Sequence, residues 1–242
     1  MAEPTEIVHL KLKSSSKLED PSSHASGLFK QALEILPKQK GFKQCLNGPR
    51  IEDPASFVMV IDWTSVDAHK QFINSEDYMP FKDRQTALTM LHAQQVALLA
   101  QIFDFEAARP PFAYHVNFAS AEALNAARSA PVTEVAAFSI LADTPASSSA
   151  KSSLEDAFGK IAQYCEANGA KGVAVGWTIE KFENPEGKMV NSLQVMVGWN
   201  SVEHHKEVTQ LYLSSRSTTK SIKELTVPGK DGMGLFHLKF RQ

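Results

Sequence analysis

Two histidines in similar local sequences are the residues best suited to acid–base chemistry. His69 ends the run 63–69 (W-T-S-V-D-A-H), and His205 ends the run 199–205 (W-N-S-V-E-H-H). An imidazole exchanges a proton near neutral pH, so either histidine could serve as a general acid or base in a pocket. In the alternative interpretation, each is a buried structural histidine that hydrogen-bonds a nearby carbonyl. The duplication favours the structural role, because a reaction rarely needs two copies of one catalytic group.

Asp62 and Tyr78 join His69 as candidate catalytic residues. Asp62 ends the otherwise apolar segment before the run 63–69. The matching position before the second run, 199–205, is Gly198, and the two runs with their neighbouring residues are called the first and second copy. The Asp62 carboxylate could tune His69, or it could face solvent. Tyr78 follows the predicted helix that carries His69, and it could donate a proton through its phenol. Since the second copy repeats neither Asp62 nor Tyr78, this divergence favours a reaction carried out by the first copy alone.

Six aromatic or imidazole side chains are predicted to contribute to ligand binding. The tryptophans among them end two similar strands, and packing is the favoured interpretation for both. Two of the histidines recur in the last strand of each copy, where we favour a structural role that links the two halves by polar contacts. The six candidates are Trp63, Phe72, His115, Trp199, His205 and His237.

The sequence contains no recognised cofactor or metal motif. It lacks G-x-G-x-x-G, G-x-x-x-x-G-K-[ST] and H-E-x-x-H, and it lacks the G-x-S-x-G of hydrolases. His204 and His205 are adjacent, but neighbouring residues of a helix point about 100° apart and do not readily share one ion. We therefore expect no cofactor and no metal site.

The sequence segments that must position these residues occur twice in the chain. Segments 57–72 and 193–208 share identical residues at five positions, all at one constant offset. Shorter matches flank them in the same order, which chance similarity would not preserve. The flanking matches are 52–54 with 183–185 and 114–118 with 236–240.

This duplication defines the expected domain organisation. Residues 1–118 are expected to form the first repeat, residues 119–131 a linker with room for one helical turn or two, and residues 132–242 the second repeat. Within the second repeat, the stretch 146–153 is rich in Ser, Ala and Lys and is expected to be a loop.

Each repeat is predicted to run strand, helix, strand, strand, helix, strand. The strand at 57–63 is apolar on both alternating faces, so neither face is expected to meet water. Ser65 is a suitable N-cap for the next helix, and the spacing then turns His69 toward the sheet. In the last strand, the apolar residues of 114–118 are expected to pack on the helices, which leaves His115, and His237 in the second repeat, on the opposite face.

The predicted βαββαβ order, with a W-x-S-x-x-x-H run at the start of its second helix, resembles the dimeric α/β-barrel superfamily. The similarity is greatest to the branch named after antibiotic-biosynthesis monooxygenases, and to fused tandem forms found in fungal proteins. It extends from Glu6 to Phe240. The resemblance implies an α+β fold in which two ferredoxin-like repeats pack their antiparallel sheets face to face as an intramolecular dimeric α/β barrel.

The same resemblance implies a cofactor-independent enzyme of secondary metabolism that acts on an aromatic or polyketide-like small molecule. Monooxygenases, cyclases and decarboxylases all occur in the superfamily. Its plant-type polyketide cyclases use a Tyr and a His. The corresponding places here are Phe72 and Tyr78 in the first repeat, and they fall near Val208 and Ser214 in the second. That pair is therefore absent, which argues against a cyclase of this type.

The expected pocket lies between the sheet and the helices of one repeat. The alternative function is a non-catalytic small-molecule binder or stress-related scaffold, whose fused repeats make a permanent pseudo-dimer. A cavity of about 300–1,000 Å³ with convergent polar groups would favour the enzyme. A filled core beneath the helices would favour the scaffold.

Composition limits the partners and the location. The chain has 25 Lys and Arg against 27 Asp and Glu, a net charge of −2, which argues against a nucleic-acid binder. No apolar run approaches the roughly 18 residues of a membrane span, and the N-terminus is polar. Cys45 and Cys165 are too few for a disulfide framework. We expect a cytoplasmic protein with a small apolar or aromatic ligand and no nucleic-acid or membrane partner; further association into a homodimer stays open.

Overall fold

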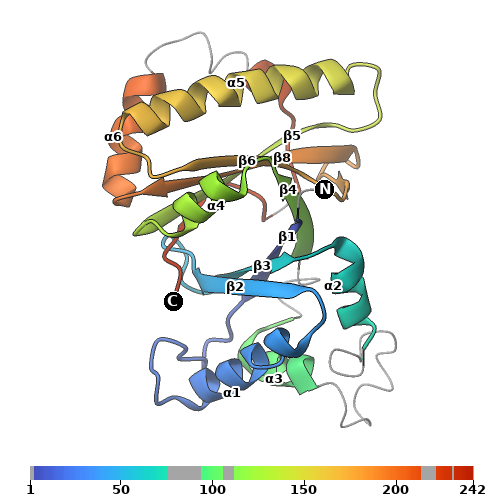
Figure 1. The fold of residues 1–242 in the computed structure, drawn as a ribbon, viewed down its shortest axis with the longest axis vertical. Helices are drawn as coiled ribbons and strands as arrows, with labels where there is room; N and C mark the ends of the chain where they lie inside the picture. The colour runs from blue at the N-terminus through green and yellow to red at the C-terminus, as the bar shows by residue number, and fades with distance from the viewer. Residues whose placement is uncertain (1–2, 76–93, 106–111, 214–221, 231, 242) are drawn as a thin grey trace. The chain divides into compact units, whose positions relative to one another are not determined.

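The computed structural model describes residues 3–75, 94–105, 112–213, 222–230 and 232–241 of the 242-residue chain (Figure 1). Contacts divide the chain into two compact units. Unit 1 contains residues 3–47 and 53–113, and unit 2 contains residues 48–52 and 114–242. Tyr78 lies outside the described residues.

These units and the sequence repeats are different divisions of the chain, because similar sequence defines a repeat and contacts in space define a unit. β4 (Phe112–Phe118), the last strand of the first repeat, pairs antiparallel with β6 (Val173–Thr178) through its residues 116–118. The short segment 48–52 of the first repeat also belongs to unit 2. Unit 2 therefore contains residues of both sequence repeats.

Unit 1 is built on β3 (Ser56–Trp63), which lies between β2 (Phe42–Pro49) and β1 (Thr5–Lys11). β1 and β3 are antiparallel in a register that places Glu6 opposite Ile61. Residues 57–61 of β3 are all buried, so the prediction that both faces of this strand avoid water is confirmed.

Helices cover the face of this sheet that carries Phe57, Met59, Ile61 and Trp63. They are α1 (His24–Leu33), a short 3₁₀ helix (Leu36–Lys38), α2 (Val66–Ile73) and α3 (Gln94–Ile102). Four large apolar side chains of β3 join helix residues in one core cluster. Full burial of each such side chain stabilises the fold by about 1.5–3 kcal/mol, which fixes the helices on this face.

The predicted Ser65 cap after β3 is present, and a matching serine caps the helix that follows Trp199 in unit 2. The hydroxyl of Ser65 accepts from the backbone N–H of Ala68 at 3.0 Å and begins α2. Ser201 accepts from the backbone N–H of His204 at 3.1 Å at the start of α6 (Val202–Leu213). A side-chain oxygen at this position satisfies a first-turn N–H that has no partner within the helix.

Unit 2 contains a longer antiparallel sheet in the order β4-β6-β8-β5-β9, with β7 also paired to β8. A turn at 184–187 joins β7 to β8. Asn184 donates its backbone N–H to the Lys188 carbonyl, and Gly187 adopts a φ of 74°. The remaining strands are β5 (Val132–Leu141), β7 (Phe182–Glu183), β8 (Met189–Trp199) and β9 (Phe236–Leu238). Both units thus combine antiparallel strands with helices, and the mixed α+β class is confirmed.

Helices lie on both faces of the unit 2 sheet (Figure 1). On one face, Leu193 and Trp199 of β8 share a core cluster with α5 (Ser147–Ala167). On the opposite face, a Cβ at Gly198 would lie 2.9 Å from the Cα of Ala127 in α4 (Ala121–Arg128). Residues 119–131, predicted as a linker with one or two helical turns, therefore hold a helix of eight residues that packs closely against β8.

Two local expectations were wrong. The stretch 146–153 is not a loop, because α5 begins at Ser147 and continues through it. Serine is a weak helix former, but burial of Leu154 and Phe158 further along outweighs that preference. The last strand of unit 2 is also turned the other way: His237 of β9 contacts His205 of α6, so the histidine faces the helix and not away from it.

The apolar residues of β4 lie on the sheet face away from α5. Tyr114 donates its hydroxyl to the side-chain oxygen of Gln194 at 3.1 Å, on the face of the sheet away from α5. Asn117 lies opposite Trp177, which belongs to the α5 cluster. Among the described residues, no helix combines the length and apolar character needed to span a bilayer.

Candidate functional site

A buried carboxylate, imidazole and indole form the polar centre of unit 1. Glu6 accepts a hydrogen bond from the indole N–H of Trp63 at 2.9 Å. The same Glu6 oxygen lies 3.4 Å from Nε2 of His69, within ion-pair distance. The His69 ring stacks on Trp63 with centroids 5.0 Å apart. Buried charges need such partners, and here each of the three side chains orients the other two.

Three elements place these groups. Glu6 lies on β1 opposite Ile61, so its side chain points to the helix-covered face of the sheet. Trp63 is the last residue of β3, and His69 follows on the first turns of α2, whose start is fixed by the Ser65 cap. The sequence prediction that His69 faces inward is confirmed, since the residue is only 8% exposed.

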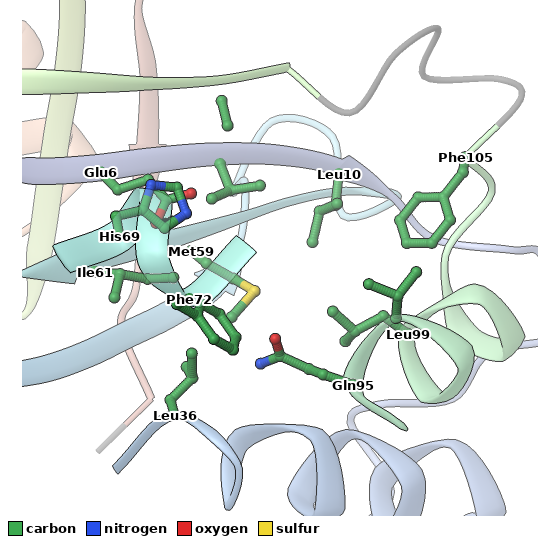
Figure 2. Close-up of a pocket in the computed structure, with 13 residues that line it drawn as sticks. Glu6, Leu10, Leu36, Met59, Ile61, His69, Phe72, Gln95, Leu99 and Phe105 are labelled. Atoms are coloured by element: carbon green, nitrogen blue, oxygen red, sulfur yellow. Dashed lines mark ion pairs between the residues drawn. The ribbon is translucent and has the colours of Figure 1, made fainter. Parts of the chain in front are cut away.

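A cavity of about 120 Å³ lies beside this centre, between the sheet of unit 1 and helices α2 and α3. Figure 2 shows Glu6 and His69 at one side of this space and Gln95 with Leu99 at another. The lining is mainly apolar, and Phe72 contributes its ring to the wall. Its polar lining residues are Glu6, His69 and Gln95.

Gln95 is a site residue that the sequence reasoning missed. Its amide NH₂ donates to the backbone carbonyl of Ala32 in α1 at 3.0 Å, and the residue is 3% exposed. No motif surrounds it, and it follows a segment outside the described residues. A glutamine at an otherwise apolar helix position was the only available signal.

Asp62 is placed apart from His69. It accepts from the Thr5 hydroxyl at 2.7 Å and from the Gln44 amide at 2.6 Å. Asp62 and Thr5 are opposite each other on neighbouring strands, on the face of the sheet away from Glu6. The acid beside His69 is therefore Glu6, which the sequence reasoning did not select. The signal was an acid at matching places in the first strand of both repeats, Glu6 and Glu134.

Unit 2 contains the same three residue types with nearly the same distances. Glu134 accepts from the indole N–H of Trp199 at 2.9 Å, and Nε2 of His205 lies 3.3 Å from that Glu134 oxygen. The His205 ring stacks on Trp199 with centroids 5.3 Å apart. The predicted similarity of the two tryptophan–histidine runs thus extends to their contacts.

A further histidine extends the group in unit 2. Nδ1 of His205 lies 2.7 Å from Nε2 of His237. His237 in turn bonds Glu52 through Nδ1, and its backbone N–H donates to the second Glu52 oxygen at 3.0 Å. Four ionisable groups therefore run in sequence from the half-exposed Glu52 to the buried Glu134.

Burial sets the protonation of this chain of groups. Burial and the neighbouring charge of His237 lower the pKa of His205 to about 4. Burial raises the pKa of Glu134, although the bond from Trp199 opposes the change. Burial acts the same way on Glu52, but the hydrogen bonds from His237 outweigh it and lower the pKa of that carboxyl. At neutral pH, His205 is uncharged, and its two ring nitrogens face His237 and Glu134.

His115 makes the corresponding contact in β4. Its Nδ1 lies 2.6 Å from a Glu180 oxygen, and its backbone N–H donates to the other oxygen at 2.7 Å. Like His237 with Glu52, this pair joins a residue of one sequence repeat to a residue of the other. Those polar contacts match the structural role predicted for both histidines.

Comparisons with known proteins support the fold. No protein-family model and no curated protein matches the chain. An anthrone oxidase-like protein superposes with a TM-score of 0.62 at 10% identity, over 100% of this chain and 92% of its own. A protein named as a chlorite dismutase gives 0.56 at 12% identity, over 100% and 96%. One named as a monooxygenase, from Fusobacterium nucleatum subsp. nucleatum, gives 0.53 at 9%, over 100% and 93%.

Identities this low carry information about the fold only. The chain shares the overall α+β fold of these three proteins. Activity has to be argued from the residues of the site.

Proposed function

We propose that this protein is a monooxygenase-like enzyme that oxidises a small aromatic molecule without a cofactor, in the cavity of unit 1. One observation carries the proposal: the buried Glu6–His69 pair borders an otherwise apolar cavity. An apolar pocket with a few convergent polar groups is the usual form of a small-molecule site.

The pair is suited to removing a proton from a phenol or an activated CH₂ group. The imidazole of His69 accepts the proton, and the nearby Glu6 carboxylate stabilises the resulting imidazolium. Glu6 is held in turn by the Trp63 indole, which fixes the direction of the His69 ring. The electron-rich anion left on the substrate reacts with O₂; one oxygen atom enters the ring as a quinone oxygen and the other leaves as water.

The test is oxygen uptake with anthrone and with single-ring phenols. Anthrone is included because a protein with this fold is named anthrone oxidase-like. His69→Gln and Glu6→Gln are expected to lower kcat by about 100-fold or more, in the range of general acid–base catalysis. His205→Gln and Glu134→Gln change the matching residues of unit 2 and are the controls, with kcat expected to stay near the wild-type value.

Turnover by His69→Gln at the wild-type rate would refute this assignment. Tyr78→Phe belongs in the same series, because the sequence analysis predicts Tyr78 as a second proton-transfer residue. A loss of kcat in Tyr78→Phe with unchanged KM would support that role.

The cavity volume favours a second candidate function, a non-catalytic binder of small molecules. About 120 Å³ is below the 300–1,000 Å³ of most ligand pockets, although engineered cavities of about 150 Å³ bind benzene. Stoichiometric binding of a single-ring phenol with no oxygen uptake in the wild-type protein would favour the binder.

We also propose that the two sequence repeats form an internal pseudo-dimer from one duplicated unit. The paired Trp–Glu–His contacts support this, because duplicated sequence alone does not require duplicated hydrogen bonds. Fusion makes the association of repeats independent of protein concentration. Light scattering that gives the mass of one chain across a wide concentration range would agree, and a concentration-dependent loss of fold on dilution would contradict it.

A further inference from the structure

Gln95 presents a hydrogen-bond acceptor to the cavity. Its NH₂ group faces the Ala32 carbonyl, which can only accept, so the orientation of the amide is fixed by its partner. The side-chain oxygen therefore points the other way, into the space bordered by Phe72 and Leu99 (Figure 2). The one side-chain hydrogen bond described for Gln95 uses its NH₂ group, and the residue lines the cavity while being only 3% exposed.

A ligand that fills the cavity shields this oxygen from water, so a ligand without a donor leaves the acceptor unpaired at a cost in free energy, and a ligand with a donor avoids that cost. In the part of the chain that the structure describes, the cavity wall also includes the apolar side chains of Val96, Leu99 and Phe72. The cavity is thus polar at two places: an acceptor at Gln95 and a proton-accepting pair at Glu6 and His69.

We infer that Gln95 is a specificity-determining residue that accepts a hydrogen bond from a second hydroxyl of the substrate. The substrate class is then a single aromatic ring with hydroxyl groups at opposite positions, one facing Glu6 and His69 and the other facing Gln95. The part concerning Glu6 and His69 rests on the proposed function. The Gln95 part rests on its burial and on the fixed amide.

The cavity volume agrees with one ring. About 120 Å³ is close to the volume of engineered cavities that bind benzene. A site built to bond a hydroxyl rejects analogues that lack it, because the buried polar group is then left unpaired. The cavity volume therefore limits the size of the ligand, and Gln95 selects its polarity.

The test compares hydroquinone with 4-methylphenol, in which a methyl group replaces one hydroxyl at nearly constant size. Anaerobic titration calorimetry measures binding without turnover. The wild-type protein is expected to bind hydroquinone about 5- to 100-fold more tightly than 4-methylphenol, the range expected when a buried acceptor is left unpaired. In Gln95→Met, which keeps the side-chain length without the amide, that preference is expected to disappear.

Leu99→Ala is the matched control, because it enlarges the same cavity without changing its polar groups. It is expected to change both affinities by the same factor, so the hydroquinone preference remains. Thermal unfolding checks that Gln95→Met folds; the Ala32 carbonyl keeps a backbone donor from Ile35. Should Gln95→Met not fold, the wild-type and Leu99→Ala preferences still decide the matter.

The outcomes separate this inference from the proposed function. Equal affinities for both ligands in the wild-type protein would overturn the role of Gln95 and leave the Glu6–His69 assignment standing. A preference that survives in Gln95→Met would overturn it as well. A normal hydroquinone preference with unchanged turnover in His69→Gln would overturn the proposed reaction alone. Failure of both ligands to bind would overturn both.

Discussion

Acidification should destabilise this protein through His205, an effect whose size can be worked out. The pKa of His205 is lowered from 6.5 to about 4 in the folded protein. Between these two values the unfolded chain binds a proton at this residue that the folded protein does not, so the free energy of unfolding falls as the pH is lowered. Each pKa unit corresponds to about 1.36 kcal/mol, which gives a loss of about 3 kcal/mol by the lower end of the window.

Neighbouring carboxyls shape the rest of the pH profile. The pKa of Glu134 is raised from 4.5, so folded protein retains a proton that the unfolded chain releases, and acidification toward 4.5 gains stability at this site. The pKa of Glu52 is lowered from 4.5, so its contribution is lost only below that value. Within the window from 6.5 to 4.5, loss at His205 and gain at Glu134 therefore act in opposite directions.

A variant isolates the histidine. His205→Gln keeps hydrogen-bonding groups but cannot take up a proton, so its unfolding free energy should lack the His205 dependence. Urea unfolding, followed by tryptophan fluorescence at intervals from about pH 7.5 to about pH 4.5, measures both proteins. The advantage of the wild-type protein over His205→Gln is expected to shrink by between about 2 and about 3 kcal/mol across this range. The exposed His24 provides the control variant, His24→Gln. A difference in unfolding free energy between the wild-type protein and His205→Gln that stays constant with pH would refute the reasoning.

Three other predictions concern packing, capping and thiol reactivity. Gly176→Ala is expected to lower the free energy of unfolding by about 2 kcal/mol, because its Cβ would lie 2.4 Å from the Asn117 carbonyl oxygen. Gly159→Ala, whose Cβ would have nothing within 4 Å, is expected to raise the free energy of unfolding by about 0.5–1 kcal/mol. Urea unfolding compares the two variants. Ser65→Ala removes the cap of α2 and should cost about 1 kcal/mol, measurable by thermal unfolding. Burial raises the pKa of the Cys165 thiol to about 12, so a thiol reagent near neutral pH should label it only after unfolding; rapid labelling of native protein would contradict this.

The sequence predicted those elements whose signals are local. The apolar run of β3 required burial on both faces, and Ser65 required a helix to start where α2 starts. The repeated tryptophan–histidine runs also predicted that His69 and His205 face inward, as they do. In each of these cases the deciding interaction lies within a few residues of the signal.

The site depended on contacts between distant residues, which the sequence does not display. Glu6 is the acid beside His69 because β1 pairs with β3, and this register places Asp62 on the opposite face. Gln95 reaches the cavity only because α3 packs near α1. The expected loop at 146–153 failed for a related reason: core burial further along α5 decided a segment whose own residues favour a loop.

The two histidine runs show why a motif alone does not assign a catalytic role. Ser65 and Ser201 fix the start of each helix, and a tryptophan and a glutamate fix each ring, so the motif determines orientation in both units. In unit 2, the two ring nitrogens of His205 lie 2.7 Å from His237 and 3.3 Å from Glu134. His69 borders an apolar cavity, and a base becomes useful only where such a space lets a substrate reach it.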